Sequence, residues 1–274
     1  MSTAHEDHTL GFDPGELSTV GLKVAWQEPV LRLTLAAPDR RNAQSPQLWS
    51  VLARVGDWVR GRDRGVQIIV IDAEGLSFSA GLDRRMFTPE GIPGQTSLMD
   101  VVRADDADKL TFIEAAQAGF RWLRDVPAVS IAVVSGHAIG AGFQLALAAD
   151  VVVPHHDAVF AMKETSWGLV PDLGGSLPMV RGAGYGPALI ACATGQDITA
   201  AQLASWGLAL TPVDDPAAES ARIIDALLAT PPGAVADLKD LFTGIGQRRR
   251  SDQWQREAQV QSRRLNAWAE QLPS

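Results

Sequence analysis

The stretch from Val126 to Asp150 constrains the fold more than any other part of the chain. Residues 128–134 form a short apolar run rich in β-branched side chains, which predicts a strand buried on both faces. Residues 141–149 are apolar on nearly every side and are built largely from strong helix formers, so they predict an interior helix. A glycine-rich turn at residues 136–142 joins the two segments. The sequence therefore predicts a buried strand that leads directly into the N-terminus of a buried helix.

This turn is suited to bind an oxygen atom that becomes negatively charged. Gly136, Gly140 and Gly142 let the backbone turn tightly and approach a ligand without an intervening Cβ. The first N–H groups of a helix have no partner within the helix and carry partial positive charge. A dinucleotide site is excluded because Leu145 stands where its fingerprint requires a third glycine. We expect half of an oxyanion hole here, and an ordinary packing turn is the alternative.

Composition limits the classes of partner. The 274 residues allow one large domain or two small ones, 46% of them are hydrophobic, and the formal net charge is −8. A chain of this charge does not attract nucleic acid or an anionic membrane surface. It contains no run of 18 apolar residues, which excludes a transmembrane helix.

Cysteine and histidine usage argues against a metal centre. The single cysteine, Cys192, cannot form an internal disulfide and leaves no cysteine cluster for structural zinc. His137, His155 and His156 lack ligand spacing and an acidic partner, so no metal site is expected. Residues 1–19 are polar and acidic, without the apolar core of a signal peptide. We therefore expect a cytoplasmic protein that begins with a flexible leader at residues 1–19.

The rest of the chain divides into a mixed α/β core and a helical C-terminal region. Ser45 and Pro46 stand in the order favoured at a helix N-terminus. Strands are expected at residues 20–26, 30–35, 66–71, 151–153 and 158–161, the first two as a hairpin, and helices at residues 46–60, 97–124 with an interruption near 103–105, 174–181, 187–194 and 200–205. The later part is helical to the end, with a break at residues 230–233. We expect a core at residues 20–212 and a helical region at residues 213–274.

Three motifs, taken in order, resemble those of the crotonase (enoyl-CoA hydratase/isomerase) superfamily. They are Ser-Phe-Ser-Ala-Gly-Leu-Asp at residues 77–83, Ile-Gly-Ala-Gly-Phe-Gln-Leu-Ala at residues 139–146 and Phe-Ala-Met-Lys-Glu at residues 160–164. The resemblance implies an α/β fold in which strand-strand-helix turns form a spiral and the helical C-terminal region trimerises. It also implies a homotrimer or homohexamer that binds an acyl-CoA thioester, with coenzyme A as part of the substrate and no other cofactor.

The resemblance assigns the oxyanion hole to the backbone N–H groups of Ala80 and Ala141. These groups would bind the thioester oxygen as it becomes an enolate, and each such donor typically stabilises a transition state by about 3 kcal/mol. The positions that the resemblance assigns to substrate binding are Arg41, Ala43, Ser79, Ala80, Gly81, Leu82, Asp83, Gly140, Ala141, Gln144 and Trp167.

Three side chains decide which reaction the site performs. The resemblance makes Glu164 a catalytic base, whereas hydratases of the superfamily carry a second glutamate where this chain has Gln144, and an amide cannot accept a proton at neutral pH. Asp172 follows Glu164 by eight positions, a spacing that resembles the dienoyl-CoA isomerase branch, although that branch usually has an aspartate at position 144. A helix N-cap is the alternative role for Asp172.

We therefore expect an acyl-CoA double-bond isomerase, acting on an enoyl- or dienoyl-CoA of fatty-acid type, with Glu164 as base and Asp172 as acid. Two alternatives stay open: a hydratase in which Gln144 positions water for Glu164, and a non-catalytic acyl-CoA-binding protein. The C-terminal quarter carries large apolar side chains at helical intervals, which predicts a trimer or hexamer because exposed apolar patches of that size are rare on monomers.

Overall fold

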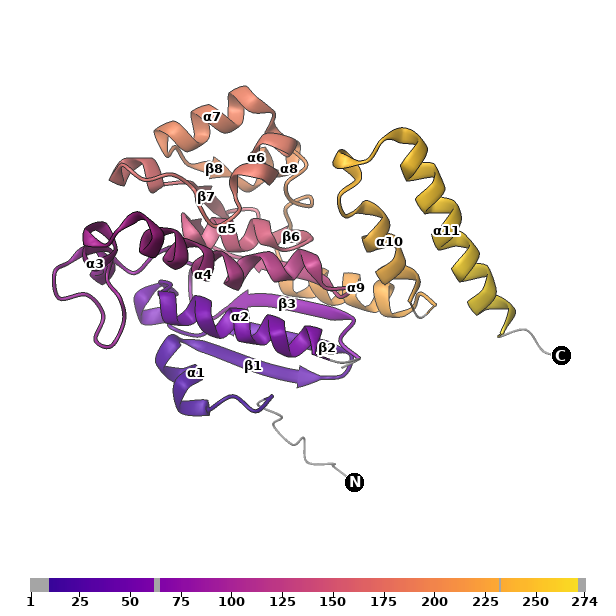
Figure 1. Ribbon diagram of the computed structural model, residues 1–274, viewed down its shortest axis with the longest axis horizontal. Helices are drawn as coiled ribbons and strands as arrows, with labels where there is room; N and C mark the ends of the chain where they lie inside the picture. Colours follow the sequence, from indigo (N-terminus) through magenta and orange to yellow (C-terminus); the bar gives the residue numbers. More distant parts are fainter. Residues whose placement is uncertain (1–9, 62–64, 232, 271–274) are drawn as a thin grey trace.

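A five-stranded sheet forms the body of the protein (Figure 1). The computed structural model describes residues 10–61, 65–231 and 233–270. The strands lie in the order β1-β2-β3-β4-β6, with β1 at Leu22–Gln27, β2 at Val30–Leu35, β3 at Ile68–Ala73, β4 at Val129–Val134 and β6 at Val151–Pro154. The predicted hairpin is present: β1 and β2 pair antiparallel, and the other neighbours pair in parallel.

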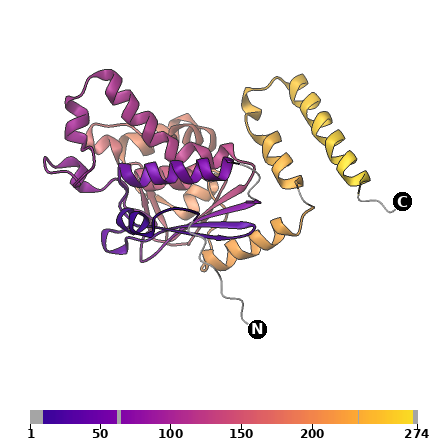
Figure 2. The same ribbon diagram turned by 60° about the horizontal axis from the view of Figure 1, so that its bottom comes forward.

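Helices cover both faces of this sheet. On one face α2 (Pro46–Arg60) and α4 (Asp106–Asp125) pack against each other, and on the opposite face α9 (Pro216–Leu228) contacts β4 and β6 (Figure 2). Strand β3 is buried on both sides, since Ile69 and Ile71 belong to the larger core and Ile68 and Val70 to the smaller core beneath α9. This double burial accounts for the unbroken apolar runs in the sequence.

A second, three-stranded sheet lies beside the predicted glycine turn. It consists of β5 (His137–Ile139), β7 (Val159–Ala161) and β8 (Ile198–Thr199), in that order. The sequence predicted β7 but not β5 or β8: β5 lies within the glycine-rich turn, and β8 has only two residues, which carry no periodicity. Helix α5 (Ala141–Ala148) begins directly after this turn, as predicted, and its first seven residues are buried.

Two helices in the N-terminal half refine the predictions. The expected helix at residues 97–124 is two helices, α3 (Leu98–Arg103) and α4, separated at the predicted interruption, where the Asp105 side chain caps α4. Helix α1 (Pro14–Val20) was missed and corrects the leader assignment for residues 14–19, because Leu17 and Val20 are buried in the larger core. Asp13 before Pro14 was a readable signal, since the Asp13 side chain caps this helix.

The remaining helices follow β7. They are α6 (Ser176–Ala183), α7 (Tyr185–Thr194) and α8 (Ala200–Ser205), then, after α9, α10 (Ala234–Phe242), the 3₁₀ turn η4 (Ile245–Gln247) and α11 (Arg250–Ala269). Both views show α10 and α11 as a pair of helices set apart from the body of the molecule (Figures 1 and 2). We call α10, η4 and α11 the C-terminal arm. None of the described helices is long and apolar enough to cross a membrane.

The C-terminal arm is fastened to the core by Lys239. Its ammonium group donates to the carbonyl oxygens of Leu123 at 2.9 Å and Ala128 at 2.7 Å, and it pairs with the Asp150 carboxylate at 2.6 Å. Burial lowers the pKa of Lys239, and the charge of Asp150 offsets part of that effect. One buried cation therefore joins α10 to the residues that flank β4.

Candidate active site

Backbone pairing brings the three sequence motifs together. A parallel bridge joins Ser79 to Ala138, and the N–H of Ile139 donates to the Ser79 carbonyl at 2.9 Å. The N–H of Gly140 donates to the Ala161 carbonyl at 2.8 Å, which aligns the turn with β7. A Cβ on Gly81 would lie 2.5 Å from the Ile139 oxygen, too close for any residue but glycine. The loop at residues 79–83 therefore lies against the start of α5.

Ala141 occupies the expected position for an oxyanion donor. It is the first residue of α5, where the N–H has no partner within the helix. The N–H of Ala80, by contrast, donates to the Arg41 carbonyl at 2.8 Å and is not available to a ligand, which corrects its assignment as a donor. The N–H of Leu82 is a candidate in its place: the parallel bridge between Gln44 and Leu82 is bonded through Gly81 and Asp83, so it does not use the N–H of Leu82.

One carboxylate oxygen of Glu164 is buried without a hydrogen-bond partner in the part of the chain that the structure describes. Glu164 begins the 3₁₀ turn η3 (Glu164–Trp167), and its Oε1 accepts a hydrogen bond from Nε2 of Gln144 at 2.7 Å. Among the described residues, Oε2 of Glu164 is the buried side-chain polar atom that has no hydrogen-bond partner. A Cβ on Gly140 would lie 3.5 Å from Oε1, so the carboxyl group lies beside the turn that leads into Ala141.

The surroundings of Glu164 make its carboxylate more basic than usual. Burial raises the pKa of the Glu164 carboxyl above its usual value. The hydrogen bonds from its own backbone N–H and from Gln144 lower the pKa in part, and the nearby charge of Asp172 raises it further. A buried carboxylate with a raised pKa and an unpartnered oxygen has the properties of a general base.

Gln144 is fixed by three hydrogen bonds. Besides donating to Glu164, it accepts at Oε1 from the N–H groups of Leu173 at 2.8 Å and Gly175 at 3.1 Å. Two backbone donors on one oxygen settle the orientation of the amide, and they occupy both lone pairs of that oxygen. Gln144 therefore joins Glu164 to the loop before α6, and its carbonyl oxygen cannot also orient a water molecule.

Asp172 stands at the open edge of this arrangement and does not cap a helix. Helix α6 begins at Ser176 after Gly175, with no side-chain cap, so the helix-cap alternative is wrong. The Asp172 carbonyl accepts from Nε2 of Gln117 at 2.7 Å. Although the surface of Asp172 is exposed, its carboxyl lies among enough protein groups for desolvation to raise the pKa of Asp172.

Known proteins resemble this chain in sequence and in fold. A model of the enoyl-CoA hydratase/isomerase family matches residues 25–269. The chain belongs to this family. The 1,2-epoxyphenylacetyl-CoA isomerase of Escherichia coli (strain K12) is 32% identical over 209 residues, 75% of each chain. Carnitinyl-CoA dehydratase of Salmonella typhi is 32% identical over 220 residues, 78% of this chain and 77% of the other.

Solved structures confirm the predicted fold class. One is a provisionally assigned enoyl-CoA hydratase from Thermobifida fusca, crystallised in complex with acetoacetyl-CoA. It has a TM-score of 0.87 to this chain at 37% identity, and the match covers 93% of this chain and 98% of the Thermobifida chain. An enoyl-CoA hydratase from Polaromonas sp. JS666 has a TM-score of 0.77 at 30% identity, with 89% and 91% covered. This enoyl-CoA hydratase/isomerase therefore has the crotonase-like fold.

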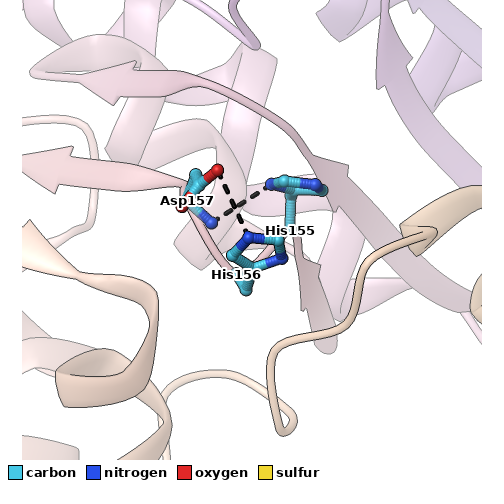
Figure 3. Close-up of side chains that lie close together, drawn as sticks. All are labelled: His155, His156 and Asp157. Atoms are coloured by element: carbon cyan, nitrogen blue, oxygen red, sulfur yellow. Dashed lines mark hydrogen bonds and ion pairs between the residues drawn. The ribbon is translucent and has the colours of Figure 1, made fainter.

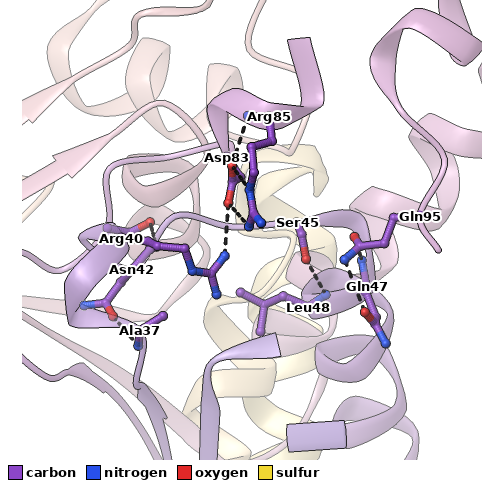
Figure 4. Close-up of polar contacts among 10 residues, drawn as sticks. Ala37, Arg40, Asn42, Ser45, Gln47, Leu48, Asp83, Arg85 and Gln95 are labelled. Carbon is purple, nitrogen blue, oxygen red and sulfur yellow. Dashed lines mark hydrogen bonds and ion pairs between the residues drawn. The ribbon is translucent and has the colours of Figure 1, made fainter. Parts of the chain in front are cut away.

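Two predicted substrate contacts, Asp83 and Ser79, have structural partners within the chain. The Asp83 carboxylate pairs with Arg40 at 3.0 Å and Arg85 at 2.7 Å and caps the 3₁₀ turn η2 (Arg84–Phe87), as Figure 4 shows. The hydrogen bonds from Arg85, together with that from Arg40, lower the pKa of Asp83 to about 2 despite its burial. The hydroxyl of Ser79 donates to the Asn42 carbonyl at 2.8 Å. These side chains hold the loop at residues 79–83 in place.

Asn42 is a supporting residue that the sequence analysis missed. Its backbone has a φ of 52°, its Oδ1 accepts from the N–H of Ala37 at 2.8 Å, and its Nδ2 donates to the carbonyls of Glu74 and Ser77 at 2.8 Å each (Figure 4 shows the Ala37 contact). Asparagine tolerates the left-handed conformation better than other residues with a Cβ, which was the readable signal. Asn42 anchors the loop that contains Arg41, which is exposed, and Ala43, which is half-buried.

The histidine pair lies in a separate turn between β6 and β7 and has acidic partners, which corrects the sequence analysis. Nδ1 of His156 is 2.7 Å from Oδ1 of Asp214, and its Nε2 is 3.3 Å from Oδ2 of Asp157. Nδ1 of His155 accepts from the N–H of Asp157 at 3.1 Å, as Figure 3 shows. Both nitrogens of His156 are paired with carboxylates, so this cluster links the turn to the residues before α9.

Proposed function

We propose that the protein is an acyl-CoA double-bond isomerase acting on an enoyl- or dienoyl-CoA. The observation that carries this proposal is the buried, unpartnered Oε2 of Glu164 beside the Gly140 turn, combined with a Gln144 whose carbonyl oxygen is fully occupied. The first feature supplies a base, and the second leaves Gln144 without a free acceptor that could take a proton from water. The names of relatives do not decide the matter, because one is an isomerase and another a dehydratase at equal identity.

The proposed mechanism uses the two carboxylates in turn. The thioester oxygen accepts hydrogen bonds from the N–H groups of Ala141 and Leu82, which together stabilise the enolate by roughly 6 kcal/mol at about 3 kcal/mol each. Oε2 of Glu164 removes a proton from the acyl chain, and the electron pair moves into the thioester. The double bond shifts when the enolate collapses and Asp172 delivers a proton at the far end of the conjugated system. Arg41 and Ala43 line the approach for coenzyme A.

Proton exchange tests the proposal directly. The full chain would be incubated in deuterium oxide with enoyl- and dienoyl-CoA esters of several chain lengths. The expected result is deuterium incorporation into the acyl chain, together with an absorbance change as the double bond moves. Formation of 3-hydroxyacyl-CoA without isomer would establish a hydratase instead, and binding without exchange would leave only an acyl-CoA-binding protein.

We further propose that the protein assembles as a trimer or hexamer through the C-terminal arm. The arm exposes large apolar side chains, namely Leu238, Phe242, Ile245, Trp254, Leu265 and Trp268. Exposed apolar groups at this density mark interaction surfaces. Sedimentation velocity should give a trimer or hexamer mass, and a monomer at every concentration would refute the assembly.

A further inference from the structure

Two aromatic side chains stack between the loops that form the candidate site. The rings of Phe87 and Trp167 have centroids 4.5 Å apart and planes inclined by 26°. Phe87 ends η2, which Asp83 caps, and Trp167 ends η3, which Glu164 begins. The stack therefore ties the loop of the oxyanion donor Leu82 to the turn of the base.

The geometry of η3 places Trp167 on the same side as Glu164. A 3₁₀ helix has three residues per turn, so side chains three positions apart lie one above the other. The reacting carbon of a substrate must lie against Oε2 of Glu164. Trp167 is then the aromatic side chain one turn of η3 away from that carbon.

The indole of Trp167 keeps an open surface for a ligand. Trp167 is 55% exposed, although Phe87 covers one of its faces, so the exposed area belongs to the other face and the edges. Met86, next to Phe87, is completely buried and anchors η2 in the core. Met86 thereby restricts the position of Phe87, which stacks on one face of the indole.

We propose that Trp167, supported by Phe87, determines specificity for acyl groups with a planar segment, aromatic or conjugated, next to the reacting carbons. This inference rests on the proposed function of the site. Aromatic rings prefer offset-stacked or edge-to-face contacts at centroid distances of about 4.5–7 Å, and such a pair gains about two- to twelvefold in binding beyond the burial of apolar area. A saturated chain of equal size buries similar area but has no π-face, and it loses more conformational freedom on binding.

Two CoA esters of equal carbon number test this inference. Phenylacetyl-CoA and cyclohexylacetyl-CoA differ in whether the six-membered ring is planar. Isothermal titration calorimetry with the full chain should give tighter binding of phenylacetyl-CoA by about two- to twelvefold. Trp167→Leu should bring the ratio of the two dissociation constants to about one, whereas Trp167→Phe, the matched control, should keep it.

The outcomes separate this inference from the proposed function. Equal binding of the two esters by the wild type, or a ratio unchanged in Trp167→Leu, overturns the specificity role while the acyl-CoA function stands. Failure of both esters to bind a wild type that still catalyses exchange with enoyl- or dienoyl-CoA also overturns the specificity role, whereas absence of that exchange as well overturns the proposed function itself. If Trp167→Leu does not fold, Phe87→Leu replaces it, with a reduced ratio as the expected result. A changed sedimentation coefficient with an unchanged ratio would make Trp167 a subunit contact and also overturn the inference.

Discussion

Replacing Gln144 tests the hydrogen-bond arrangement at the centre of the site. Gln144→Leu keeps the approximate size of the side chain but removes the acceptor of the Leu173 and Gly175 N–H groups. A buried donor left without a partner costs about 1–3 kcal/mol, so the two together cost about 2–6 kcal/mol. At about 2–4 °C per kcal/mol for a domain of this size, the melting temperature should fall by about 4–24 °C.

Gln144→Glu should behave differently because a carboxylate retains the acceptor. It places a second carboxylate where the amide nitrogen is 2.7 Å from Oε1 of Glu164, and two carboxyl groups at that distance share one proton. The carboxyl pair binds the shared proton with a raised pKa. The bridging proton therefore stabilises the folded variant at low pH, and this stabilisation is lost as the pH rises through that pKa. The melting temperature of Gln144→Glu should equal that of the wild type near pH 5 and lie below it near pH 9.

Thermal unfolding followed by circular dichroism at pH 5, 7 and 9 measures both effects. Gln47→Leu is the matched control, because Gln47 is half-buried and its side chain makes one 3.2 Å bond with Gln95 near the surface. A Gln144→Leu variant that melts within 2 °C of the wild type would refute the reasoning, since two unpaired buried N–H groups cannot be that inexpensive. A Gln144→Glu variant with no pH dependence beyond that of the wild type would show that the two side chains are not in contact.

Other substitutions give further expected outcomes. Glu164→Gln should lower the rate of exchange by about 10²- to 10⁴-fold. Glu164→Gln should also raise the melting temperature. Because folding raises the pKa of Glu164, its ionisation destabilises the fold as the pH rises above the usual glutamate range near 4.5. The increase in melting temperature should therefore be large at pH 8 and absent at pH 4. Asp172→Asn should abolish dienoyl-CoA isomerisation, and full retained activity would leave a one-base enoyl isomerase. Lys239→Met should destabilise the docking of the C-terminal arm by about 3–5 kcal/mol. Limited proteolysis should then cleave the arm faster while the core stays intact. Unchanged proteolysis would contradict the anchoring role of Lys239.

The parts of the protein that local sequence determines were predictable. The strand, turn and helix at residues 128–148 follow from composition, and Ser45 caps α2 as its sequence indicates. The roles of single N–H groups were not predictable, because whether Ala80 or Leu82 is free depends on pairing with residues 41–44, nearly 40 positions earlier. The roles of Asp83 and Asp172 depended in the same way on distant partners.

The attachment of the C-terminal arm has a consequence for how the molecule opens. Apart from the Lys239 anchor, helix α10 buries no whole residue and α11 buries one, Val260, so apolar burial contributes little to holding the arm in place within one chain. Segments with few buried contacts open locally at a much lower free energy than the core. If the arm is covered by neighbouring subunits, mass action makes its opening depend on protein concentration, whereas the opening of β3 does not. Amide hydrogen exchange in α11 should then slow as the protein is concentrated, while exchange in β3 stays constant. The exchange rate of α11 would therefore measure the degree of assembly.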